Sequence, residues 1–197
     1  MVSQLEQPAT VARSVPAMDG ASALSLPPGV DFSVVLRAPL FRELTPEQVT
    51  RFLALGTART VTAGEEIIAE GNTDTDTFVI LRGKVDVLKK LPPVLPGGAE
   101  QQKSIVQLTA PMMGIFAMGA PNMLGGLGRS ATVAAVEDCD AIVVSKEAYE
   151  RLCREDPLLG YFMTRNIAMQ IIKDLNDTNA RVVKLTQALT LALQKRQ

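Results

Sequence analysis

The sequence predicts an α+β fold in which a domain of short β-strands lies between N-terminal helices and one long C-terminal helix. Two observations lead to this prediction. Between residues 57 and 144, short apolar runs alternate with glycine turns, a pattern typical of a β-sandwich, a jelly roll or a roll. From Pro157 to about Gln194 the pattern is helical and interrupted by Gly160 alone, which predicts a helix far longer than the ordinary globular one.

The composition excludes several classes of function. The chain has 197 residues, 47% of them hydrophobic, and a net charge of −1, so it carries no overall bias toward nucleic acid. Because histidine is absent, His-dependent triads and His metal ligands are impossible, and two isolated cysteines cannot build a structural zinc site. We therefore expect no metal and no enzyme activity. The lack of a signal peptide or an apolar span predicts a cytoplasmic protein without membrane contact.

The chain is expected to begin with a disordered arm over residues 1–28, since this stretch has no periodicity and ends in prolines. Residues 32–55 predict two helical pieces broken by Pro39. Thr45-Pro46 marks the start of the second piece, because threonine caps a helix and proline suits its first position.

The strand region is divided by turns at residues 63–64, 71–72 and 82–83. The third turn predicts a hairpin about Gly83, since apolar residues alternate on both sides of it. Residues 89–102 are expected to form a loop or the tip of a long hairpin, and 104–108, 131–136 and 141–144 are further strands. Ser145 and Asp156 then predict helix starts.

The last helix carries apolar and small residues at alternating steps of three and four. They are Ala168, Ile171, Leu175, Thr178, Val182, Leu185, Leu189 and Ala192. This spacing is the seam of a coiled coil, so residues 168–192 predict a homodimer. The alternative is a helix that packs only on its own domain, and a protein partner is also conceivable.

A glycine-rich segment precedes Arg129, the one cation between Lys103 and Lys146. Backbone amides and a guanidinium are what an anion site requires. The alternative is a tight turn whose glycines supply positive φ and whose arginine is solvated, and spacing alone favours it.

Two motifs carry a resemblance to a known family. Gly64, Ile67 and Gly71 match the first, whereas Phe78, Ile80, Gly83, Val85 and Val87 match the second; Arg129 to Val133 and then Cys139, Val143 and Ser145 continue the similarity. The chain resembles the cyclic-nucleotide-binding domain of the catabolite activator protein (Crp/Fnr) superfamily. The resemblance implies a double-stranded β-helix, or β-roll, over residues 29–156 and a dimerisation helix over 157–197.

The resemblance also implies a phosphate-binding cassette. The residues it assigns to a ligand are Phe116, Met118, Gly119, Ala120, Asn122, Arg129, Ser130 and Thr132. In the family a glutamate accepts the ribose hydroxyl, but this sequence has no Asp or Glu between Glu100 and Glu137. Counting from either side places Gly119 or Phe116 there, and Asn122 is the nearest replacement acceptor. The apolar neighbours Met112, Met113, Phe116, Met118 and Met123 are expected to be core rather than a lipid or haem pocket.

The implied function is a dimeric sensor for a cyclic nucleotide or another phosphate-bearing small molecule, with a degenerate cassette. Because the sequence stops at Gln197, where the helix-turn-helix of the family begins, we expect no DNA binding. Two alternatives remain: a ligand-free scaffold or adaptor, and a regulator that acts by forming mixed dimers.

Overall fold

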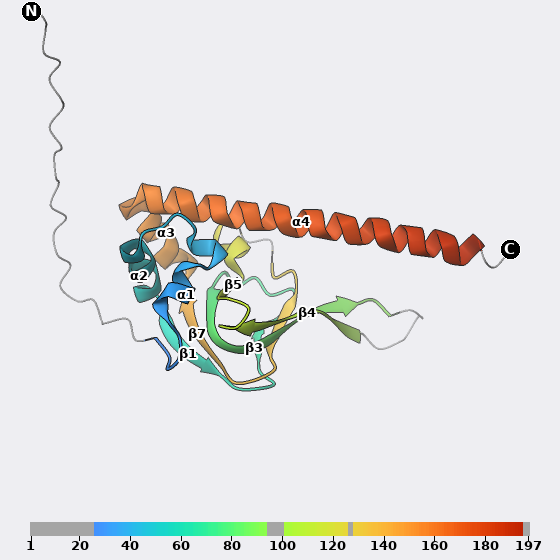
Figure 1. Cartoon of the computed structure of the whole chain (residues 1–197), viewed down its shortest axis with the longest axis horizontal. Coiled ribbons are helices and arrows are strands. Elements are labelled where there is room, and N and C mark those ends of the chain that lie inside the picture. The colour runs from blue at the N-terminus through green and yellow to red at the C-terminus, as the bar shows by residue number, and fades with distance from the viewer. Residues whose placement is uncertain (1–25, 94–100, 126–127, 195–197) are drawn as a thin grey trace, which may run out of the picture.

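The computed structural model describes residues 26–93, 101–125 and 128–194, which form a curled antiparallel β-roll with helices at one end and a long helix across it (Figure 1). The arm predicted for residues 1–28 lies outside the described residues as far as residue 25. Leu26 packs against the core.

The N-terminal helical segment has the predicted breaks. It consists of α1 (Phe32–Leu36), the 3₁₀ turn η1 (Pro39–Phe41) and α2 (Pro46–Ala54). At the start of α2 the Thr45 hydroxyl accepts from the Gln48 amide at 3.2 Å, and the Gln48 side chain accepts from the Thr45 amide at 3.1 Å. This reciprocal capping confirms the predicted helix start.

Within the described residues, seven strands build the roll, and all their pairings are antiparallel. They are β1 (Thr57–Val61), β2 (Glu66–Ile68), β3 (Thr77–Leu91), β4 (Gln101–Ala110), β5 (Phe116–Met118), β6 (Thr132–Ala135) and β7 (Cys139–Val144). The first half of β3 pairs with β5 and β7, and its second half pairs with β4 and β6. The roll is therefore held together by one strand that belongs to both of its faces.

The hairpin predicted about Gly83 is wrong, because β3 runs without interruption through this residue. Gly83 has φ of 104°, and a Cβ there would lie 2.5 Å from the Asp138 carbonyl and 2.6 Å from the Cys139 sulfur. The glycine thus lets the strand bend against β7 as it passes from one face to the other, which is the role of a bulge rather than of a turn.

The region predicted as a loop or long hairpin tip is a hairpin arm whose strands reach further than expected. β3 continues to Leu91 and β4 begins at Gln101, with residues 94–100 outside the described part. At the base of the arm Lys89 pairs with Glu70 at 2.5 Å, and the Lys90 amide donates to the same carboxylate.

The core is mainly aliphatic, as the composition predicts, with an edge-to-face contact between Phe41 and Phe52 at 5.5 Å. Cys139 is buried and Cys153 half-buried, and neither is in a disulfide. Burial raises the pKa of both thiols, which keeps them protonated and unreactive at neutral pH.

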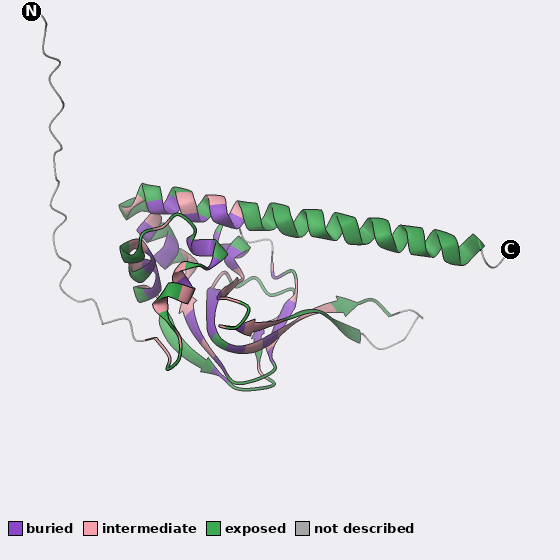
Figure 2. Cartoon of the chain, viewed as in Figure 1, coloured by how far each residue is buried: buried purple, intermediate pink, exposed green. Residues whose placement is uncertain are grey.

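Helices α3 (Lys146–Glu155) and α4 (Pro157–Gln194) begin at the predicted caps. Asp156 accepts from the Leu159 amide and from Arg51 of α2, both at 3.0 Å, so α4 starts fixed to the N-terminal helices. Its first part packs on the domain, whereas its second part extends beyond it and is exposed (Figure 2). Within the described ranges, no helix has the length and apolarity needed to cross a bilayer.

Candidate functional site

A cavity of about 800 Å³ lies between the inner wall of the roll, the glycine-rich segment before Arg129, the α1–η1 end and α4. A pocket of this size is within the range of small-molecule sites. The cavity brings together segments that are far apart in the sequence, from Val34 to Asp174.

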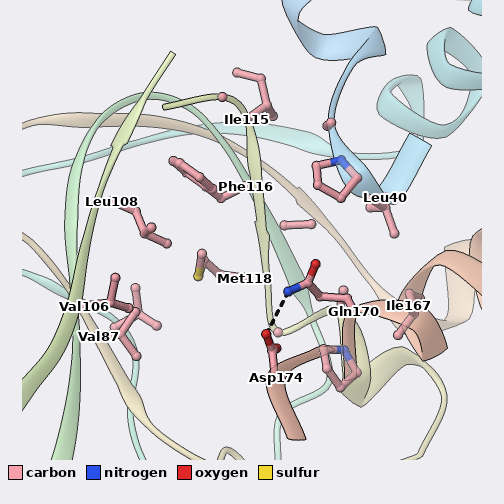
Figure 3. Close-up of a pocket in the computed structure, with 18 of the residues that line it drawn as sticks. Leu40, Val87, Val106, Leu108, Ile115, Phe116, Met118, Ile167, Gln170 and Asp174 are labelled. Carbon is pink, nitrogen blue, oxygen red and sulfur yellow. Dashed lines mark hydrogen bonds between the residues drawn. The ribbon is translucent and has the colours of Figure 1, made fainter. Parts of the chain in front are cut away.

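One wall of the cavity is hydrocarbon. Val87 and Val106 are paired across β3 and β4, and Leu108 follows on the same face of β4. Phe116 and Met118 of β5 lie opposite them (Figure 3). These side chains offer no strong hydrogen-bonding group to a ligand.

The wall formed by α4 is polar. Gln170 donates to Asp174 at 2.8 Å, and both face the apolar group in Figure 3. Lys173 also lines the cavity. Asn166 is occupied elsewhere, because its amide donates to the carbonyls of Leu40 and Arg42 at 3.0 and 2.7 Å and so fixes α4 to the η1 segment.

Arg129 is held by its backbone and its side chain. Its amide donates to the Asn72 carbonyl at 2.7 Å, and its carbonyl accepts from the Gly71 amide at 2.9 Å. Its side chain is 2% exposed; Nε and Nη2 donate to Asp74, and Nη2 also donates to the Asp76 carbonyl at 2.6 Å. The solvated arginine of the tight-turn alternative is therefore wrong.

One nitrogen of this guanidinium, Nη1, is buried and has no hydrogen-bond partner among the described residues. It lies against Gly119, which has φ of 81° and leaves the space that the nitrogen occupies. A buried unpaired donor on a charged group is costly. At the wall of a cavity, it is a position where a ligand's anionic oxygen would be stabilised.

The structure brings most of the predicted site residues to the cavity. Those that line it are Phe116, Met118, Gly119, Ala120, Asn122, Arg129 and Ser130. Thr132 is not among them: it is buried, and its hydroxyl accepts from the Glu70 amide at 3.0 Å. Asn122 donates to the Gly128 carbonyl at 3.4 Å, and the carbonyl of Ser130 accepts from Lys89 at 2.6 Å.

The expectation that the methionines and Phe116 are core holds fully for Met123, and in part for Phe116 and Met118, which are half-buried and pack against the core. Met112 and Met113 are exposed in the turn before β5, and Met113, Phe116 and Met118 line the cavity.

Sequence reasoning missed the two aspartates that contact Arg129. Asp74 and Asp76 lie in a polar segment after Gly71 that predicts only a turn. The lining of the cavity carries more positive than negative charge. Among the described residues that line it, three are cationic (Arg37, Arg129 and Lys173) and one is a carboxylate (Asp174). In the same described part, no group of three or more metal-ligating side chains is found.

Comparisons with known proteins agree with this geometry. Residues 58–156, half of the chain, match the model of the cyclic nucleotide-binding domain. No curated protein sequence matches.

Among solved structures, the catabolite activator protein of Thermus thermophilus is 26% identical, with a TM-score of 0.62 over 75% of this chain and 63% of that one. The chain thus spans less than two thirds of that protein. The N-terminal domain of a transcriptional regulator from Streptomyces coelicolor A3(2) is 19% identical, with a TM-score of 0.60 over 74% of this chain and 94% of that one.

The sensor domain of the transcriptional regulator DNR from Pseudomonas aeruginosa is 18% identical, with a TM-score of 0.53 over 73% and 90% of the two chains. These two more distant structures share the fold, whereas the family match carries the assignment. The chain belongs to the cyclic nucleotide-binding domain family.

Proposed function

We propose that this chain is a non-catalytic regulatory module that senses an anionic small molecule bound in the roll cavity at Arg129. The observation that carries the proposal is the buried Nη1 of Arg129, which has no partner in the described residues and belongs to a side chain of the cavity lining. A charge-assisted hydrogen bond to a ligand oxygen would satisfy it. Arg37 and Lys173 add positive charge at the cavity wall.

We infer that cyclic AMP is a weak ligand. The family's carboxylate acceptor for ribose has no counterpart between Glu100 and Glu137. A hydrogen bond to a charged group contributes about 1.5–3 kcal/mol, so its loss weakens binding about tenfold to a hundredfold. Asn122 is a neutral substitute, and its amide already donates to Gly128.

We further infer that the module is a dimer through the seam of α4. In the single chain the seam is exposed to water, with Leu185 at 69% and Leu189 at 62%. Burying such side chains contributes about 1.5–3 kcal/mol each, and an unpaired apolar stripe of this length on one helix calls for a partner. A second copy supplies an identical stripe, as in a parallel coiled coil.

A second candidate function is a scaffold that dimerises without a ligand. It is favoured by Asp74, which already pairs with the arginine and would compete with an incoming anion. The two candidates differ in whether any anion binds.

Titration calorimetry on the purified protein separates them, with cyclic AMP, cyclic GMP and inorganic phosphate as probes and Arg129→Lys as the variant. The sensor predicts weak binding that the variant reduces at least tenfold, because lysine has no counterpart of the Nη1 donor. A submicromolar dissociation constant for cyclic AMP would show that the ribose has another partner. Heat from none of the three probes would favour the scaffold.

A further inference from the structure

We propose that the cavity takes an amphipathic acid, with a carboxylate or phosphate head on Arg129 and a hydrocarbon body along the apolar wall. This inference rests on the proposed function, because it assigns a chemical class to the ligand of the same site. It adds to the proposed function that the hydrocarbon body of the ligand, rather than its anionic head, supplies most of the binding free energy.

The head-group position follows from Arg129. Its guanidinium has three donor nitrogens, and two of them, Nε and Nη2, donate to Asp74 and the Asp76 carbonyl. Nη1 is left buried and unpaired. An anionic oxygen satisfies this donor, whereas a neutral polar head would leave the charge uncompensated apart from Asp74.

The body position follows from the wall beside it. Ile68, Val87, Val106 and Leu108 from the roll, with Phe116 and Met118 from β5, present hydrocarbon, an aromatic ring and a thioether. A nucleoside placed against this wall would lose water from its hydroxyl and ring polar groups, and these apolar side chains offer no hydrogen bond in return. An alkyl or aryl body loses no hydrogen bond, so it suits this wall better.

The rim of the cavity supports the same chemistry. Met113 is 57% exposed and Val106 is 39% exposed, and both line the cavity, so the apolar surface continues to the solvent. Unbranched methionine side chains adapt to bodies of different length. The cations Arg37 and Lys173 outnumber the single lining carboxylate, which favours an acid over an amine.

The test is a titration of the full chain with octanoate, decanoate and dodecanoate below their micelle concentrations, and with dodecyl phosphate and dodecanol. We expect the affinity to rise roughly fourfold per added methylene, since each contributes about the burial free energy of one CH₂ group. Dodecanol should bind at least tenfold more weakly than dodecanoate, because it lacks the charge. The ratio of the dissociation constants of dodecanoate and dodecyl phosphate identifies the preferred head group.

Two matched pairs of variants test the location. Val106 and Ile105 are neighbours on β4 with exposed fractions of 39% and 44%, but only Val106 lines the cavity; Met113 and Met112 are the same pair in the turn, at 57% and 82%. Val106→Asp and Met113→Asp should each weaken dodecanoate at least tenfold. Ile105→Asp and Met112→Asp should leave the affinity within twofold, and circular dichroism checks the folding of all four.

The outcomes separate this inference from the proposed function. If cyclic AMP or phosphate binds in an Arg129-dependent manner while dodecanoate does not, the sensor stands and the amphipathic ligand is overturned. An affinity independent of chain length, or equal effects within each variant pair, also overturns it. If no anion binds at all, both proposals fail.

Discussion

The guanidinium of Arg129 occupies the space that a side chain on residue 119 would fill. Gly119 has φ of 81°, and a Cβ there would overlap Nη1 and lie 3.0 Å from the Asp76 carbonyl. The glycine is thus required twice, by the backbone conformation and by the buried cation.

Gly119→Ala should therefore destabilise the fold by about 1–3 kcal/mol and abolish anion binding, because a strained φ and a displaced Arg129 act together. Gly125→Ala is the control, since a Cβ there meets no heavy atom within 4 Å. Denaturant unfolding and calorimetry measure the two effects. Equal behaviour of the two variants would contradict the role of Gly119.

Asp74 competes with a ligand for Arg129, and its side chain is 46% exposed. Asp74→Asn should raise the affinity for dodecanoate or phosphate about fivefold, and it should lower the free energy of unfolding by about 1–3 kcal/mol, because the buried Arg129 guanidinium loses its carboxylate partner. Asp86→Asn removes the same charge on the hairpin arm, where Asp86 accepts from Ser104 and Gln107. A fall in affinity with Asp74→Asn would mean that Asp74 positions the arginine.

The exposed seam of α4 predicts a dimer, and charged side chains introduced into the seam should dissociate it. Replacing both Leu185 and Leu189 by lysine should produce monomers, because four like charges would face each other in the buried seam. Gln187→Lys adds a charge on the polar face and should leave the dimer intact. Sedimentation of the three proteins decides it, and a dimer that survives the double substitution would require another interface.

Tyr149 predicts a loss of stability at alkaline pH. Burial raises the pKa of Tyr149 to about 12, above the ordinary tyrosine value of 10.0, although its hydroxyl is 3.0 Å from that of Thr164. Between these pH values the unfolded chain releases the proton and the folded chain keeps it. The free energy of unfolding should thus fall by up to about 2–3 kcal/mol as the pH rises through this window, and its contribution is complete below pH 10.

The chain has two tyrosines, and Tyr161 is exposed. In Tyr161→Phe the absorbance of tyrosinate reports Tyr149 alone and should titrate near pH 12. Tyr149→Phe should remove the alkaline slope of stability, whereas Tyr161→Phe should keep it. A titration of Tyr149 near the ordinary tyrosine value would contradict the buried hydroxyl.

Local signals in the sequence predict the helices well, because caps and breakers act within a few residues. Thr45, Ser145 and Asp156 each cap the helix that follows, as their side-chain bonds confirm. Gly83 is different. Positive φ suits a turn and a bulge equally, and only the distant contact with Asp138 and Cys139 distinguishes them.

Only part of the candidate site could be predicted, because some of its contacts join residues that are distant in the sequence. Arg129 and the glycine-rich segment are recognisable from spacing, but the pairing with Asp74 joins residues 55 positions apart. Periodicity does not reveal which apolar residues face an internal space. Met123 and Met118 look alike in sequence, yet one fills the core and the other lines the cavity.

Helix α4 lines the cavity at one end and extends far beyond the domain at the other. Asn166 fixes it to the η1 segment, Gln170 and Asp174 border the cavity, and the remaining turns to Gln194 carry the exposed seam. At 1.5 Å per residue the helix extends about 40 Å beyond Asn166, so a tilt of about 5° at the cavity moves its far end by about 3.5 Å. A small displacement by a ligand would thus be enlarged at the end most distant from it, which would alter the spacing of whatever the two helices of a dimer carry there.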